Sequence, residues 1–174
     1  MEQLVLNLDL LFVFLRGCMS INKDYQNVKY LKYVGVVLFV LYLAYLIYLT
    51  FFDHRYGREM VDRSINIIPL KTIILFLTSS FNRNIIVTNI VGNIVAFMPM
   101  GFLLPIAFKK LNSFVTVSLI VLVSTVSIEV LQYITGFGAT DIDDIILNLL
   151  GGVLGYSVFK VILRIPLIKD LFGN

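Results

Sequence analysis

The stretch Asp141-Ile142-Asp143-Asp144-Ile145-Ile146-Leu147-Asn148-Leu149-Leu150, followed by Gly151 and Gly152, places three carboxylates directly before an apolar run. Ionised side chains at the mouth of a membrane helix are costly to place, so their presence there indicates a use for them. The apolar run reaches the ~20 residues that a rise of 1.5 Å per residue requires to cross a ~30 Å hydrocarbon core. We therefore predict a membrane helix over residues 141–163 with functional side chains at its start.

The composition of the whole chain supports this prediction. Its 174 residues are 59% hydrophobic and 14% charged, and the mean hydropathy is +0.91. Soluble chains are about 45–50% apolar and about 25% charged, so the composition indicates an integral membrane protein, and the length predicts a single domain over residues 1–174. The one cysteine, Cys18, excludes an internal disulfide framework, and no basic run interleaved with aromatics indicates nucleic-acid binding.

Three further stretches have the length and hydropathy of membrane helices: residues 29–52, 84–108 and 111–136. Residues 1–28 form an N-terminal segment whose apolar part, residues 4–15, is too short to span, so we expect it to lie at or dip into the membrane. Residues 64–78 are apolar but contain Pro69, which breaks or starts a helix. The predicted fold is an all-α membrane protein with four transmembrane helices and an interfacial or re-entrant segment at residues 64–78.

The distribution of charge predicts the orientation of these helices. One side receives nine basic residues, Arg16, Lys23, Lys29, Lys32, Lys109, Lys110, Lys160, Arg164 and Lys169. The other side receives five, Arg55, Arg58, Arg63, Lys71 and Arg83, together with most of the acidic residues. The positive-inside rule therefore places the N- and C-termini in the cytoplasm and the aspartate cluster outside.

Helical geometry groups the polar side chains. At about 100° per residue, Asp141, Asp144 and Asn148 fall on one stripe of the helix over residues 141–163, whereas Asp143 points away from that stripe. Asn93 and Glu129 lie on other predicted helices at a depth similar to that of Asn148, roughly 10–14 Å below the outer surface at 1.5 Å per residue. We expect an outward-facing pocket formed by Arg63, Asn66, Asn89, Asn93, Glu129, Gln132, Asp141, Asp144 and Asn148.

Structural roles compete with this interpretation at several positions. Asn89 and Asn93 would also serve as interhelical hydrogen-bonding groups, each worth about 0.6–2 kcal/mol. The spacing of Gly151 and Gly155 is more typical of close helix packing than of a binding site. A buried Glu129 is different, because a carboxylate at this depth costs several kcal/mol unless it is paired, protonated or solvated.

The chemistry open to such a pocket is limited to three options. Glu129, Asp141 and Asp144 are candidate ligands for Mg²⁺ or Ca²⁺, which would in turn bind a phosphate or pyrophosphate headgroup. Alternatively, one carboxylate acts as a base and another, with a raised pKa, as an acid. Thirdly, these groups hydrogen-bond a sugar or an ammonium group directly. The residues alone leave all three options open and establish no cofactor.

Four blocks of sequence, in this order and spacing, resemble the VanZ-like family of teicoplanin and glycopeptide resistance membrane proteins of Gram-positive bacteria. They are residues 63–70 (RSINIIPL), 89–102 (NIVGNIVAFMPMGF), 129–132 (EVLQ) and 138–148 (GATDIDDIILN). Some members carry an arginine just before the aspartate block, where Gly138-Ala139-Thr140 stands in this chain. If that arginine matters in those members, its role here is vacant or belongs to the outer loop.

The resemblance implies a multi-pass protein of the bacterial cytoplasmic membrane with a role in reduced susceptibility to teicoplanin and related lipoglycopeptides, but it supplies no biochemical activity. We expect the pocket to bind an envelope lipid headgroup, such as that of a lipid-linked cell-wall precursor, or the drug itself. A membrane enzyme acting on a lipid-linked phosphate or glycan with a divalent cation is the first alternative. The second is a non-catalytic scaffold in which Gly151 and Gly155 dock a partner helix. The sequence does not determine the oligomeric state.

Overall fold

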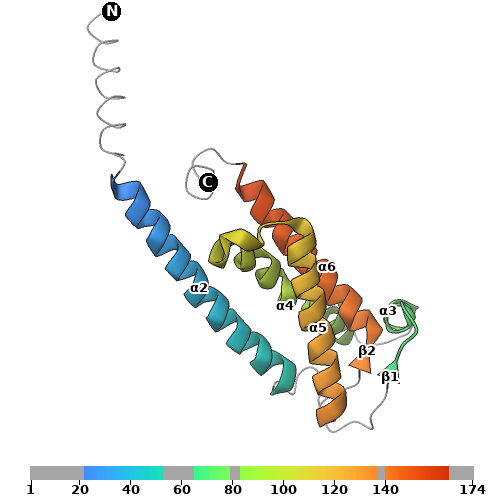
Figure 1. The fold of residues 1–174 in the computed structure, drawn as a ribbon. Coiled ribbons are helices and arrows are strands. Elements are labelled where there is room, and N and C mark those ends of the chain that lie inside the picture. Colours follow the sequence, from blue (N-terminus) through green and yellow to red (C-terminus); the bar gives the residue numbers. More distant parts are fainter. Residues whose placement is uncertain (1–21, 53–64, 79–82, 137–139, 165–174) are drawn as a thin grey trace, which may run out of the picture.

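The computed structural model describes residues 22–52, 65–78, 83–136 and 140–164, and these residues form an all-α structure (Figure 1). The long helices are α2 (Asn22–Phe51), α4 (Arg83–Ala107), α5 (Phe114–Thr135) and α6 (Ile142–Ile162). The shorter elements are β1 (Ile65–Asn66), α3 (Lys71–Thr78), η2 (Lys109–Leu111) and β2 (Thr140–Asp141). Within the described ranges, four helices are long and apolar enough to cross a membrane, which confirms the predicted number of spans.

The helix boundaries differ from the predicted ones at a few positions. α2 begins at Asn22 and therefore extends into the segment predicted to precede it. The stretch that we expected to be interfacial or re-entrant contains β1 and α3, and the eight residues of α3 are too few to cross a bilayer. Residues 1–21, which include most of the expected N-terminal interfacial segment, lie outside the described residues.

The distribution of side chains is that of a membrane protein. Large apolar residues on α5, such as Val123 and Ile134, are 63% and 62% exposed. The buried polar or charged residues, in contrast, are Thr50, Thr125, Glu129, Gln132, Asp143 and Asn148. Polar groups that face the interior of a helix bundle while apolar groups face outward are the arrangement that a lipid environment favours.

Helix α4 packs against α2, α5 and α6, and helix α6 packs against both α4 and α5. Its contact with α4 is close because glycines remove the side chains between the two backbones. A Cβ atom at Gly151 would overlap the carbonyl oxygen of Ile94, and one at Gly155 would overlap that of Met98. From the other helix, a Cβ atom at Gly101 would overlap the carbonyl oxygen of Gly152. Because α4 itself occupies this glycine surface, it is not available to a partner helix, contrary to the scaffold alternative.

Helix α2 joins the bundle through α4. The Tyr42 hydroxyl donates a hydrogen bond to the carbonyl oxygen of Ala96 at 2.9 Å. Nearer the end of α4, the rings of Phe39 and Phe108 meet edge to face with their centroids 5.8 Å apart. The Tyr42 bond fixes the middle of α2 alongside α4, and the Phe39 contact fixes α2 at the end of the bundle opposite the polar site.

The long helices alternate in direction, so the end of α2, the start of α4, the end of α5 and the start of α6 lie at one end of the bundle (Figure 1). β1 and β2 form a two-residue parallel bridge at this end, with Ile65 opposite Thr140 and Asn66 opposite Asp141. α3 follows β1 and contacts both α4 and α6. This alternation brings polar residues that are distant in sequence to the same end of the molecule.

Candidate functional site

The three aspartates at the start of α6 have three different sets of partners. Asp141 has extended backbone angles (φ −130°, ψ 125°) and caps α6, because its side chain accepts the N–H of Asp143 at 2.9 Å. Its carboxylate also accepts hydrogen bonds from the Asn66 amide at 2.8 Å and from the Thr72 hydroxyl at 2.5 Å. Asp141 therefore ties the start of α6 to β1 and α3.

Asp143 caps a different helix. Only 1% of its surface is exposed, and its carboxylate accepts the backbone N–H groups of Leu70 at 2.5 Å, Thr72 at 2.8 Å and Ile73 at 3.1 Å. Thr72 and Ile73 belong to the first turn of α3 and Leu70 directly precedes it. Amides at the start of a helix have no partners within their own helix. Leu70 itself has a left-handed backbone conformation (φ 65°), which is unfavourable for a residue with a side chain. The hydrogen bond from its N–H to Asp143 supports this conformation. The sequence correctly predicted that Asp143 points away from the helix face that carries Asp144 and Asn148. It did not predict that Asp143 caps α3.

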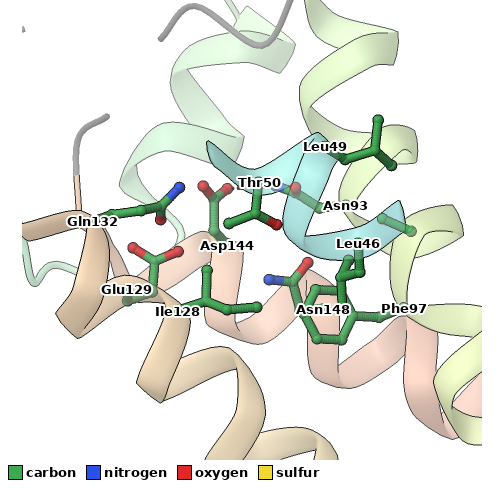
Figure 2. Close-up of a pocket in the computed structure, with 11 residues that line it drawn as sticks. Leu46, Leu49, Thr50, Asn93, Phe97, Ile128, Glu129, Gln132, Asp144 and Asn148 are labelled. Carbon is green, nitrogen blue, oxygen red and sulfur yellow. Dashed lines mark hydrogen bonds between the residues drawn. The ribbon is translucent and has the colours of Figure 1, made fainter. Parts of the chain in front are cut away.

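Asp144 is the aspartate that faces the interior of the bundle. It accepts a hydrogen bond from the Asn93 amide on α4 at 2.6 Å. Both residues line a cavity of about 30 Å³ between α2, α4, α5 and α6 (Figure 2). Its lining consists of Leu46, Leu49, Thr50, Asn93, Ala96, Phe97, Ile128, Glu129, Gln132, Asp144 and Asn148.

Asn148 forms the deeper polar wall of this cavity. The side chain is 4% exposed, and its amide nitrogen donates to the Thr125 hydroxyl at 2.8 Å. Its amide oxygen is buried and has no hydrogen-bond partner among the described residues, and Figure 2 shows this oxygen directed away from α5, on the side of Thr50 and Leu46. Rotating the amide by 180° would exchange the two atoms and leave a donor there instead. Either orientation presents one unsatisfied polar atom, which is rare in a native structure.

Glu129 and Gln132, one turn apart on α5, form the opposite wall and are 3% and 6% exposed. The Glu129 carboxylate accepts the backbone N–H of Asp141 at 3.0 Å. Its backbone carbonyl accepts the Thr140 hydroxyl at 3.2 Å. Glu129 therefore connects the cavity to the bridge that precedes α6, and a displacement of β2 would move a cavity carboxylate.

The structure brings together five of the nine residues expected to form a pocket: Asn93, Glu129, Gln132, Asp144 and Asn148. Asn66, Asn89 and Asp141 are not among the residues that line the cavity, and Arg63 lies outside the described residues. Asp141 departs from the expectation because α6 begins at Ile142. The 100° spacing that aligned Asp141 with Asp144 applies only within a helix, so it fails at an extended capping residue.

The described lining of the cavity is rich in polar groups. It includes two carboxylic acids, Glu129 and Asp144, together with the amides of Asn93, Gln132 and Asn148 and the hydroxyl of Thr50. Over the described part of the chain, no group of three or more His, Cys, Asp or Glu residues is placed to hold a metal ion. Asp141, the third candidate ligand for Mg²⁺ or Ca²⁺, is directed to Asn66 and Thr72. Among the described lining residues, the oxygen ligands open to a cation are two carboxylates with amide and hydroxyl oxygens beside them.

Comparison with known proteins identifies the family. A sequence model described as VanZ/LLP1 matches residues 39–164, which is most of the chain. The chain belongs to the VanZ/LLP1 family. It is also 34% identical over 97 residues to Protein VanZ of Enterococcus faecium, a match that covers 56% of this chain and 53% of that protein. The chain thus spans about half the length of this curated relative, and no solved structure matches it.

The family match includes every residue that lines the cavity, from Leu46 on α2 to Asn148 on α6. It also includes Asp141 and Asp143 with their partners on β1 and α3. In this VanZ-family chain the polar cavity and the two capping aspartates form one connected unit, because Asp141 donates its N–H to Glu129 and accepts the N–H of Asp143. Thr50 and Thr125 belong to that unit as well. Thr125 precedes Glu129 by four residues on α5, so helical spacing places the two on one face.

Proposed function

We propose that this VanZ-family membrane protein lowers susceptibility to teicoplanin and related lipoglycopeptides, and that the cavity between α2, α4, α5 and α6 is the site responsible. In this proposal the cavity binds a polar group of a membrane-anchored ligand, either an envelope lipid or the drug. Membership of the family supports the resistance role, and the name of the E. faecium relative agrees with it.

The unsatisfied amide of Asn148 is the observation that carries the proposal. A buried polar atom without a hydrogen bond costs about 1–3 kcal/mol, so a protein retains one where a ligand or an ordered water supplies the missing partner. Here that atom lies in a cavity with the carboxylates of Glu129 and Asp144. A ligand that enters would regain the cost of the unsatisfied amide as binding free energy.

The size and charge of the cavity narrow the ligand chemistry. A volume of about 30 Å³ accommodates one or two groups of the size of water. The described lining offers two carboxylates, three amides and one hydroxyl, groups that favour a ligand hydroxyl, amide or ammonium group. We infer that only the tip of a headgroup enters, while the apolar part of the ligand lies among the lipid chains beside the helices.

The side of the membrane to which the cavity opens is inferred from the distribution of lysine and arginine between the two ends of the helices. The proposal places the end that carries β1, β2 and α3 on the outer side of the cytoplasmic membrane, and both termini on the cytoplasmic side. The excess of lysine and arginine at the opposite helix ends supports this placement. A lipoglycopeptide acts from outside, so the cavity would open on the side where the drug arrives.

Susceptibility measurements on isosteric variants test the proposal. Glu129→Gln and Asp144→Asn remove one charge each while preserving side-chain shape, and Asn148→Leu fills the cavity with an apolar group. Each is expected to restore teicoplanin susceptibility in a strain where immunoblotting of membranes shows normal protein levels. Ser127→Ala is the matched control on α5, because its hydroxyl bonds only within its own helix. The proposal fails if all three cavity variants protect as well as the control does.

A catalytic role would give a different result in a second experiment. The enzyme alternative predicts that purified protein converts a labelled lipid-linked phosphate or glycan and loses this activity when a chelator removes divalent cations. The binding proposal predicts saturable retention of the ligand without turnover, and no effect of the chelator on retention. Turnover that depends on Glu129 and Asp144 would replace the binding proposal with the enzymatic one.

A further inference from the structure

A second hollow lies at the other end of the membrane-spanning helices. It is lined by Lys32, Ala107, Phe108, Lys109, Lys110 and Leu111 and has a volume of about 430 Å³. Three of these six described residues are lysines. The remaining three are apolar, and Ala107 at the end of α4 is completely buried. The described lining of the hollow is therefore mainly apolar in surface and includes three lysines.

The position of the hollow coincides with an expected membrane boundary. Lys32 lies near the start of the apolar stretch of residues 29–52 on α2, and Ala107 is the last residue of α4. Phe108 is held beside α2 by its edge-to-face contact with Phe39. Lysines at the ends of two adjacent spans lie at the depth of lipid headgroups, while the apolar walls adjoin the depth of the acyl chains.

We propose that this hollow binds an anionic phospholipid, whose phosphate contacts Lys32, Lys109 and Lys110 and whose acyl chains begin along Phe108 and Leu111. Charge complementarity carries the assignment, because basic pockets between membrane helices bind anionic headgroups. The apolar walls favour a lipid over a free phosphate, which would gain nothing from Phe108 and Leu111. The end of α4 adds backbone carbonyls, which favour the lysines at this position.

Such a lipid would join α2 to α4. The two helices contact each other along the bundle, but the chain between them contains the stretch of residues 53–82, so no short loop fixes their relative position. A phosphate that contacts Lys32 from α2 and Lys109 and Lys110 from η2 bridges the two segments. Because Leu46 and Thr50 of α2 line the polar cavity, a bound lipid would also hold one wall of that cavity.

Lipid titration of the full-length protein in detergent, followed by native mass spectrometry, tests the proposal without any drug. The probes are phosphatidylglycerol, phosphatidylcholine with the same acyl chains, and soluble glycerol phosphate. We expect phosphatidylglycerol to bind about tenfold or more tightly than phosphatidylcholine, and glycerol phosphate not to compete at equal concentration. Equal binding of the two lipids overturns the proposal, and effective competition by glycerol phosphate overturns the lipid assignment in favour of a free anion.

A charge-matched pair of variants locates the site. The triple variant K32Q/K109Q/K110Q is expected to lose the preference for phosphatidylglycerol, while K71Q/K160Q/R164Q removes the same number of charges elsewhere and retains it. Both triplets consist of partly or fully exposed side chains, and circular dichroism verifies that both variants keep their helices. If the second variant loses as much preference as the first, non-specific attraction explains binding and the proposal is wrong. The result is independent of the resistance role, since neither experiment measures susceptibility.

Discussion

Replacing Asp143 by alanine tests whether one carboxylate of α6 holds α3 in place. The change removes the acceptor of three backbone N–H groups, those of Leu70, Thr72 and Ile73. Loss of an N-terminal cap costs about 0.5–2 kcal/mol, and hydrogen bonds to a charged group in a buried setting contribute about 1.5–3 kcal/mol. Because the three bonds share one carboxylate and are not additive, we expect α3 to lose about 2–4 kcal/mol of local stability.

Hydrogen exchange followed by mass spectrometry measures this loss directly. Local opening governs the exchange of amides in a docked helix, and each 1.4 kcal/mol corresponds to a factor of ten. Exchange of peptides covering residues 70–78 should therefore accelerate by about 30- to 1,000-fold, while peptides from α5 keep their wild-type rates. Asp143→Asn retains one acceptor oxygen but presents an amide donor to the other N–H groups, so an intermediate acceleration is expected.

Asp144→Ala is the matched control for this experiment. It removes the neighbouring carboxylate of the same helical turn, whose bond to Asn93 joins α6 to α4. Exchange in α3 should stay at the wild-type rate in this variant. If Asp143→Ala leaves exchange of residues 70–78 unchanged, or if both variants accelerate it equally, the assignment of Asp143 as the cap of α3 is refuted.

Three further substitutions test the packing of the bundle through the unfolding of purified protein in detergent. Thr125→Val leaves the Asn148 amide without its hydroxyl partner and should cost about 1–3 kcal/mol; Thr125→Ser should restore most of it, and equal stability of the two would contradict the bond. Gly155→Ala should cost about 1–3 kcal/mol by forcing α6 away from the Met98 carbonyl, and an unchanged midpoint would rule out the close approach. Tyr42→Phe removes one interhelical hydrogen bond and should cost about 0.6 kcal/mol; a loss several times larger would show that the hydroxyl has a further role.

The spans could be predicted from the sequence because the bilayer imposes a simple length requirement. About 20 apolar residues are needed to cross it. A helix in lipid satisfies its backbone hydrogen bonds within its own segment, so a span can be predicted without knowledge of long-range contacts. Five residues that line the cavity could also be predicted from the sequence: Asn93, Glu129, Gln132, Asp144 and Asn148. They lie inside regular helices, where the direction and depth of a side chain follow from its residue number. The expectation for Asp141 was wrong in phase, since α6 begins one residue later.

The roles of Asp141 and Asp143 were not accessible in this way. Their partners on β1 and α3 are 69 to 75 residues distant in the chain, and no periodicity links segments so far apart. The bridge between β1 and β2 has only two residues on each side, which is too short for an alternating pattern. The glycine surface of α6 was predicted to pack, but only the structure shows that α4 occupies it.

The sequence by itself determined that the chain has, over its described residues, four helices long and apolar enough to cross a membrane, with carboxylates at the start of the last one. Hydropathy and helical geometry are local properties, so both could be predicted without the fold. The tertiary structure decided what each carboxylate does. Asp141 and Asp143 satisfy backbone and side-chain donors of a short segment packed beside them, and only Asp144 joins Glu129 in the cavity. Hydrogen bonding is directional and short-ranged, so three adjacent acids acquire different roles once folding places different donors around each of them.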